Sequence, residues 1–431
     1  IGKTLDVGAL KAMLGAINSL YQRRGYVVCE ARILPQRIRD GVLALTLIEG
    51  RTEALDITGN SSTNSRFIAA AFDLEEGEVA NYREMSEDLV HWNMTSDVVL
   101  SIDIRAGNAP GTTRYTIRAV EPERFALNVF ADSLGPETTG RLRAGASITD
   151  RSVFGLRDSL MVLGLASRGA KSGLVSYSLP LSARGTRLTL SASRGEVKVK
   201  SGPSAEMDVT GESNYLSARL ETPLYVSAKQ KWTGYVSAMN QHSETSMFDV
   251  KMNATRIKTL TAGLEGLVYG EGSVYYLNAA LNRQRAVEEI FINDWQSYTF
   301  TGSAFAKWRF NPTDALSVSA AWQKRLGGDS LTSAQQFYLG TGSGVRGYPN
   351  DLIAADSGAW VNLEVERDPG RPYPVPFAFI DAGRLSGDSV YSTRSLASAG
   401  FGIRVPLWQG AQLSGWAAMP LVKNVPAGAE V

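Results

Sequence analysis

The spacing of apolar residues changes about a quarter of the way along the chain. Near the amino terminus apolar residues recur every three or four positions, which is typical of one face of an α-helix. Gly25 ends the first such pattern, and alternating segments follow it. The pattern predicts two helix–strand–strand cycles, with helices over residues 5–24, 67–72 and 82–92 and strands over residues 27–28, 42–50, 98–105 and 115–120.

From Arg124 onward the apolar residues alternate with polar ones, as in β-strands that have one apolar face. We count about 15 strands of roughly ten residues, and a β-sandwich would show the same alternation. The connections favour a transmembrane barrel, because one rim of such a barrel has short turns and the other has long loops. Short turns are predicted at residues 182–186, 226–230, 270–272, 311–314 and 408–410, and long loops at residues 134–139, 199–209, 242–253, 283–295, 331–351 and 385–394.

Composition excludes several classes of protein. The net charge of +1 gives no support for nucleic-acid binding. One cysteine cannot form an internal disulfide, and two distant histidines give little material for a metal site. We predict no catalytic residue, no metal and no small-molecule cofactor. The spacing Gly342-x-Gly344-x-x-Gly347 matches a dinucleotide fingerprint, but Pro349 and the lack of a following helix argue against it.

The segment from Gly340 to Asp351 reads GTGSGVRGYPND, and FIDAG follows at residues 379–383. The alternation places Asp381 and Gly383 on the inner wall, with Glu364 and Glu366 also pointing inward. These carboxylates are three possible partners for Arg346. The pair of motifs resembles the signature of two-partner secretion transporters (the TpsB family). The resemblance implies that Val345, Arg346, Gly347 and Tyr348 fold back into the lumen, and it selects Asp381 as the partner of Arg346.

The two cycles that precede the barrel resemble POTRA domains, the periplasmic modules of outer-membrane translocators. The first carries the residues of that pattern from Tyr21 to Asn60, including Gly25-Tyr26 and Asp40-Gly41-Val42. We predict POTRA domains at residues 1–58 (incomplete at its amino terminus) and 59–122, then a barrel at residues 123–431 with loop 331–351 inside it. The family has sixteen strands, so we expect the last one to be missing from this sequence.

The resemblance implies an exporter in the outer membrane of a Gram-negative bacterium, surrounded by lipid, with its POTRA domains in the periplasm. Its partner is expected to be a secreted TpsA-type exoprotein, recognised by its amino-terminal domain. A three-stranded sheet leaves an edge open to strand addition, and we predict that edge at Val98, Leu100, Ile102 and Ile104. The alternatives are an assembly factor for other barrels and a passive porin.

Overall fold

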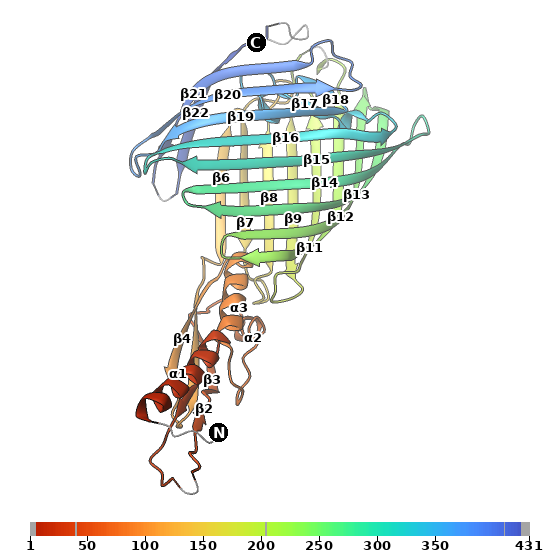
Figure 1. The fold of residues 1–431 in the computed structure, drawn as a ribbon. Coiled ribbons are helices and arrows are strands. Elements are labelled where there is room, and N and C mark those ends of the chain that lie inside the picture. The colour runs from red at the N-terminus through yellow and green to blue at the C-terminus, as the bar shows by residue number, and fades with distance from the viewer. Residues whose placement is uncertain (1–5, 39–40, 203–204, 409, 424–431) are drawn as a thin grey trace.

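The structure is a computed structural model, and it describes residues 6–38, 41–202, 205–408 and 410–423. Two small modules form a stalk below a large curved sheet (Figure 1). Asp40, which belongs to the expected POTRA pattern, and the segment 424–431 lie outside the described residues. No helix in the described ranges is long and apolar enough to cross a membrane.

The first module contains α1 (Val7–Arg23) and a short antiparallel pair, β1 (Glu30–Arg32) and β2 (Thr46–Ile48). Asp6 caps α1, because its carboxylate accepts a hydrogen bond of 2.6 Å from the Ala9 amide. Gly25, with φ of 92°, follows the helix in the left-handed conformation that favours glycine. The predicted helix is therefore present, and the first strand begins at Glu30 rather than at Val27.

The second module has a three-stranded sheet in the order β3 (Arg51–Thr58), β5 (Thr112–Val120), β4 (Val99–Ala106). The helices α2 (Ser65–Ala69) and α3 (Tyr82–Thr95) are capped by Asn64 and Asn81. They cover a core in which Trp92, Ile68 and Ile117 are almost fully buried. The pairing of β3 with β5 places residues 51–58 in the second module. We therefore propose a domain boundary after Gly50 in place of the one expected after residue 58.

The remaining strands form one antiparallel sheet of 15 strands, in which β16 pairs with β19 and all the other neighbours are consecutive. The sheet curls round on itself (Figure 1), and among the described residues β6 and β22 are its two edges. Its strands are β6 (Phe125–Asp132), β7 (Arg143–Asp150), β8 (Ser159–Ser167), β9 (Ala170–Pro180), β10 (Arg187–Lys198), β11 (Thr210–Ser227), β12 (Gln230–Met247), β13 (Val250–Gly270), β14 (Ser273–Glu288), β15 (Asn293–Arg309), β16 (Asp314–Gly328), β19 (Ser357–Arg367), β20 (Val375–Ser386), β21 (Ser395–Pro406) and β22 (Gln412–Pro420).

Two of the predicted long loops are wrong. Residues 242–253 and 283–295 are mostly strand, because β12 to β15 run 16 to 21 residues instead of about ten. Polar side chains in these segments resembled a loop, but they form ion pairs across the hairpins, such as Lys251–Glu244 at 2.6 Å and Arg256–Glu289 at 2.9 Å. The strand ladder continues there because it satisfies the backbone hydrogen bonds.

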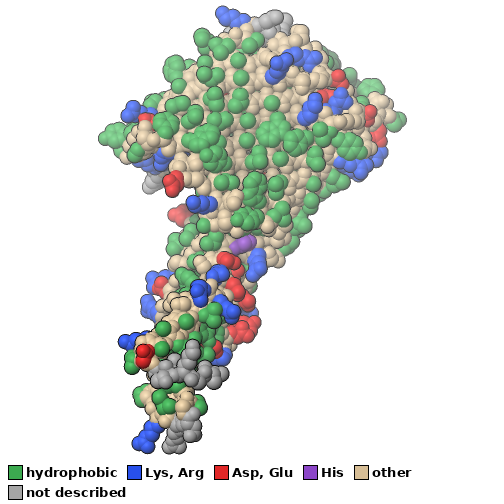
Figure 2. All heavy atoms as spheres, viewed as in Figure 1, with side chains coloured by type: hydrophobic (Ala, Val, Ile, Leu, Met, Phe, Trp, Pro, Cys, Tyr) green, Lys and Arg blue, Asp and Glu red, His purple; other side chains and the backbone are tan. Residues whose placement is uncertain are grey.

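The wall of the barrel presents apolar residues to the outside. Val361, Leu363 and Val365 on β19 are 38% to 49% exposed, and Ile380 on β20 is 55% exposed. Hydrophobic side chains are spread over the wall in Figure 2, and charged ones gather toward its margins and on the modules. The alternation predicted from the sequence therefore separates an apolar outer face from a polar inner face.

Glu121, between the second module and the barrel, links two parts of the chain. Its carboxylate accepts hydrogen bonds from the backbone amides of Ser61, Ser62 and Thr63 at 2.8 to 3.1 Å. Partial burial alone would raise the Glu121 pKa, but the hydrogen bonds from residues 61–63 lower that pKa to about 2. Because the pKa in the folded state lies below the ordinary value, the stabilisation is present above about pH 4.5 and is lost as the pH falls through about 2.

We predict that Glu121→Gln lowers the hydrogen-exchange protection of the Ser62 and Thr63 amides about tenfold at pH 7, because a charged acceptor is lost. The difference from the wild-type protein should shrink as the pH approaches 2. Hydrogen exchange of the whole protein in detergent measures both effects. Glu123→Gln, a substitution at an exposed neighbour, is the control. Equal protection in Glu121→Gln and the wild-type protein would contradict this role.

Candidate functional site

The loop between β16 and β19 lies on the inner face of the barrel. Its stem is a small hairpin of β17 (Phe337–Leu339) and β18 (Ile353–Ala355), and its tip begins with a 3₁₀ turn, η3 (Thr341–Ser343). Leu339, Val345 and Tyr348 pack with Leu385 of β20 and Leu396 of β21 in a buried apolar cluster. This cluster supplies the packing that keeps the loop against the wall.

Arg346 is at the centre of this site. Its Nε and Nη2 atoms donate to the two oxygens of Asp381 at 2.8 and 2.9 Å, and its backbone amide donates to Asp381 Oδ2 at 3.1 Å. Nη1 donates to Glu364 at 2.9 Å. The Arg346 guanidinium also lies over the Phe379 ring, 3.4 Å from its centroid. The structure thus places Arg346 against two of its three candidate carboxylates.

Glu366 instead belongs to a neighbouring set of contacts. Arg404 of β21 donates to Glu366 at 2.9 Å and also contacts Glu364, while Lys307 of β15 contacts Glu366. The three cations Lys307, Arg346 and Arg404 therefore face the three carboxylates Glu364, Glu366 and Asp381. We call these six residues the lumen charge cluster. Its formal charge is zero, which removes the cost of placing an unpaired charge away from water.

Sequence reasoning missed Lys307 and Arg404 as members of this cluster. A signal for Arg404 was present, because it lies on the same face of its strand as Gly400 and Gly402. A Cβ atom at Gly402 would lie 2.3 Å from the Phe377 ring, so the glycine leaves the room that this ring occupies. The Arg404 guanidinium in turn lies 4.1 Å from the centroid of that ring.

Glycines allow the loop to approach the wall. Gly347 has a φ of 89°, and a Cβ atom there would lie 2.9 Å from the Ala418 Cβ. A Cβ atom at Gly383 would lie 2.6 Å from Leu339 Cδ2 and 3.2 Å from Val345 Cγ2. Close packing therefore favours glycine at both positions, and at Gly347 the left-handed backbone conformation favours it as well.

Tyr348 connects the loop to the end of the barrel sheet. Its hydroxyl donates to the Ala397 carbonyl at 2.6 Å and accepts a hydrogen bond of 3.0 Å from the Val422 amide, just after β22. On the other side of the loop, the Asn350 side chain donates to the Leu134 carbonyl in the connection between β6 and β7. The loop therefore contacts the chain near both edges of the described sheet.

The predicted capture strand, β4, lies at one edge of the second module, where it pairs only with β5. The side chains of Val98 and Leu100 are buried in the module core, so they cannot contact a partner directly. Their backbone groups are also occupied. Trp92 Nε1 donates to the Val98 carbonyl at 2.9 Å, and the Asn93 amide bonds both the Leu100 N–H and its C=O at 2.8 and 3.0 Å.

The backbone groups of alternate strand residues point to the same side. Since those of Leu100 point away from β5 toward Asn93, those of Ile102 and Ile104 also point away from β5. Within the described part of the chain, no side chain hydrogen-bonds the backbone of Ile102 or Ile104 as Asn93 does that of Leu100. The open part of the edge is therefore shorter than predicted and begins at Ile102.

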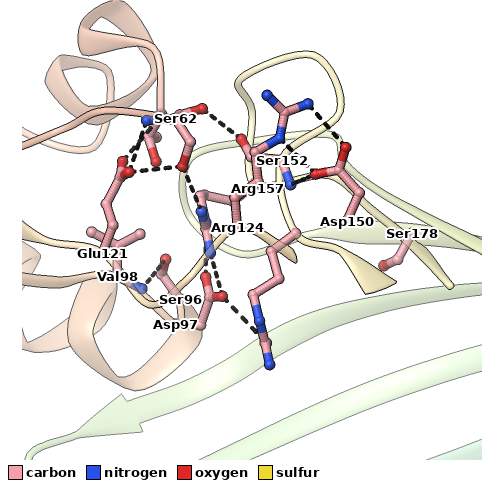
Figure 3. Close-up of polar contacts among 12 residues, drawn as sticks. Ser62, Ser96, Asp97, Val98, Glu121, Arg124, Asp150, Ser152, Arg157 and Ser178 are labelled. Atoms are coloured by element: carbon pink, nitrogen blue, oxygen red, sulfur yellow. Dashed lines mark hydrogen bonds and ion pairs between the residues drawn. The ribbon is translucent and has the colours of Figure 1, made fainter. Parts of the chain in front are cut away.

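The second module is held against the barrel by Arg157, in the turn between β7 and β8. The Arg157 side chain is 3% exposed and donates through Nε to Asp97 at 2.9 Å and through Nη1 to Ser62 at 3.2 Å (Figure 3). Ser152 Oγ donates to the Ser62 carbonyl at 2.7 Å. Two separate segments of the module are thus fixed to one turn of the barrel, a contact that no sequence pattern indicated.

No group of three or more potential metal ligands occurs within the described part of the chain. The lumen charge cluster pairs each acid with a base through direct hydrogen bonds, so its chemistry is that of a structural contact. Such an arrangement can fix the position of a loop, or release it when partners exchange.

Comparison with known families identifies the chain. The family model described as "Haemolysin secretion/activation protein ShlB/FhaC/HecB" matches residues 111–405. The chain belongs to this family. A second model, "POTRA domain, ShlB-type", matches residues 1–50. Members of the family are outer-membrane transporters of two-partner secretion, so the predicted class of function and the outer-membrane location are confirmed. The family is one of transporters rather than enzymes.

Individual relatives agree with this assignment. The chain is 24% identical over 381 residues to the heme/hemopexin transporter protein HuxB of Haemophilus influenzae, covering 84% of this chain and 67% of that protein. It is 23% identical over 430 residues to the outer membrane transporter CdiB of Escherichia coli, covering 94% of this chain and 72% of the relative.

Solved structures support the fold. The structure of CdiB from Escherichia coli superposes with a TM-score of 0.72 at 22% identity, covering all of this chain and 83% of the other. BamA from Haemophilus ducreyi lacking POTRA domains 1–3 gives a TM-score of 0.59 at 14% identity, covering all of this chain and 92% of the other. The predicted β-barrel with amino-terminal POTRA modules is confirmed at the level of the fold.

We predict that Asp381→Asn destabilises the barrel by about 3 kcal/mol, because Arg346 would lose a buried ionic partner. Urea unfolding of the detergent-solubilised protein measures this change as a shift in the unfolding midpoint. The folded fraction is monitored by heat-modifiable migration. Asp388→Asn is the matched control, since the Asp388 side chain is 63% exposed and its ion pair with Arg325 faces solvent. The control should change stability by less than about 1 kcal/mol. Equal effects of the two substitutions would contradict a structural role for the Asp381 pair.

Proposed function

We propose that this transporter exports one dedicated exoprotein, which it receives unfolded in the periplasm and passes through the barrel. The observation that carries the proposal is the loop of Arg346, which packs on the inner wall through the lumen charge cluster and Tyr348. A loop lodged in the lumen can hold the pore in a form that admits an extended chain. A passive porin needs neither this loop nor the two amino-terminal modules.

Capture begins in this proposal at the open end of β4. An extended segment of the exoprotein adds as a further strand beside Ile102 and Ile104, whose outward N–H and C=O groups supply main-chain hydrogen bonds. The Asn93 side chain occupies the backbone groups of Leu100. The added strand can therefore pair with β4 only from Ile102 onward. The amino-terminal domain of the exoprotein is the segment that we expect to bind there.

The junction at Arg157 then sets the direction of transfer. Because Arg157 and Ser152 fix Ser62 and Asp97, the second module keeps one orientation to the barrel (Figure 3). A captured strand is thereby presented at a constant position relative to the pore. No nucleotide is available outside the inner membrane, so folding of the exoprotein at the cell surface would supply the free energy of export.

The assembly of other barrels is the second candidate function. The likeness to BamA favours it only at the level of the fold, since the identity is 14%. The match of the haemolysin secretion family model over residues 111–405 favours the exporter. We therefore place the dedicated exporter first.

Quantitative proteomics of the source bacterium, with and without this protein, separates the two functions. The supernatant, the cell surface and the outer membrane are compared in parallel. Loss of one large secreted or surface protein, with the outer membrane otherwise unchanged, is the expected result for an exporter. Broad depletion of other barrel proteins would instead establish an assembly factor.

We predict that Ile104→Pro reduces exoprotein binding by at least about tenfold, because proline removes one outward N–H from the open edge. Ile104→Ala is the control, since it removes the side chain and keeps the N–H. Binding of an amino-terminal exoprotein fragment to the full transporter in detergent is measured by surface plasmon resonance. If proline and alanine weaken binding equally, the backbone of β4 does not form the added strand.

A further inference from the structure

We propose that the barrel rim farthest from the modules binds the phosphate groups of the phosphorylated glycolipid that occupies the outer leaflet. The site is a cavity of about 440 Å³ lined by Arg168, Lys171, Lys198 and Lys200. We call these four residues the rim cluster. The proposal rests on the outer-membrane location of the family and adds a ligand that the export function does not require.

Three connections of the chain build this cavity. The turn between β8 and β9 contains Gly169, whose N–H donates to the Thr139 carbonyl at 2.7 Å and whose carbonyl accepts from Lys198 N at 2.7 Å. The Lys200 amide donates to the Thr138 carbonyl at 2.7 Å. A Cβ atom at Gly169 would lie 2.3 Å from the Lys198 carbonyl oxygen, so glycine permits the close approach. Backbone bonds therefore bring the basic residues of separate strands together.

The rim cluster lies at the end of the barrel opposite the modules. The chain leaves the second module at Glu121 and enters β6, which runs away from the module, and β7 returns toward it. The turn between β7 and β8 contacts the module through Arg157. β8 then runs outward again and ends at Ser167, next to Arg168. With the modules in the periplasm, this turn is at the cell surface.

Two of the four basic residues, Lys171 and Lys198, also lie on the outer face of the wall. Alternate residues of a strand share a face, so Lys171 shares one with Val175 of β9, and Lys198 shares one with Leu190 of β10. Val175 and Leu190 are both 46% exposed on the apolar outer surface. The rim cluster therefore lies just beyond the apolar band, at the depth where the headgroups of surrounding lipids lie.

The charges of the cavity favour an anion. Its three carboxylates already have cationic partners, since Arg194 pairs with Glu196 and Glu212, and Lys251 pairs with Glu244. Lys198 pairs with Asp208. Within the described part of the chain, no ion pair is formed by Arg168, Lys171 or Lys200. Three cations without counterions beside one cavity complement the charge of a phosphorylated headgroup.

The test compares lipid binding to two double variants of the full-length transporter. Arg168→Gln with Lys171→Gln removes two cations of the rim cluster. Arg309→Gln with Lys229→Gln removes one arginine and one lysine from exposed positions at the opposite rim, so the net charge changes equally. Native mass spectrometry counts bound molecules after addition of purified outer-leaflet glycolipid, its dephosphorylated form, or phosphatidylglycerol. Heat-modifiable migration verifies that each variant is folded.

We expect the rim variant to bind the glycolipid at least about fivefold more weakly than the wild-type protein, and the control variant to bind as the wild type does. Dephosphorylation should lower binding to the wild-type protein by a similar factor. Equal binding of the glycolipid by the rim variant and the control would overturn the site. Equal binding of phosphatidylglycerol and glycolipid to the wild-type protein would overturn the assignment of the ligand. Secretion of the exoprotein, assayed separately, tests the export function independently.

Discussion

The contact on which the rest of the site depends is the bidentate hydrogen bond between Arg346 and Asp381. Asp381 is fully buried, and a buried carboxylate without a cationic partner is costly. Arg346 donates hydrogen bonds to this carboxylate from its side chain and its backbone amide, and its remaining Nη atom donates to Glu364. Glu364 and Glu366 then need Arg404 and Lys307, so the contacts that begin at one loop residue link four strands of the wall, β15, β19, β20 and β21.

This charge balance explains why the loop lies inside the barrel. If the loop left the lumen, Asp381 would lose its cation, and Glu364 would retain only Arg404. The apolar contacts of Val345, Tyr348 and Leu339 add packing that a solvent-exposed loop could not have. The same arrangement implies that any movement of the loop during export must supply new partners for these charges.

The sequence predicted the parts of the fold that depend on local pattern. Alternation located the strands and assigned Asp381, Glu364 and Glu366 to the inner face, and helical spacing found α1 and α3. It could not locate the ends of β12 to β15, because cross-strand ion pairs extend these hairpins through polar segments that resemble loops. Contacts between distant segments, such as Arg157 with Asp97 or Asn93 with Leu100, leave no periodic signal. The family resemblance supplied the choice of Asp381, which spacing alone left open among three carboxylates.

Secretion by an Arg346→Ala variant tests most directly whether the lumen charge cluster serves export. The exoprotein is quantified in the supernatant and on the cell surface, while heat-modifiable migration shows that the barrel is inserted in the outer membrane. Arg384→Ala, on the same strand as Asp381 but exposed, is the control and should secrete normally. We expect Arg346→Ala to reduce secretion at least about tenfold with the barrel still inserted. Normal secretion by an inserted Arg346→Ala barrel would contradict a role for the arginine loop in export.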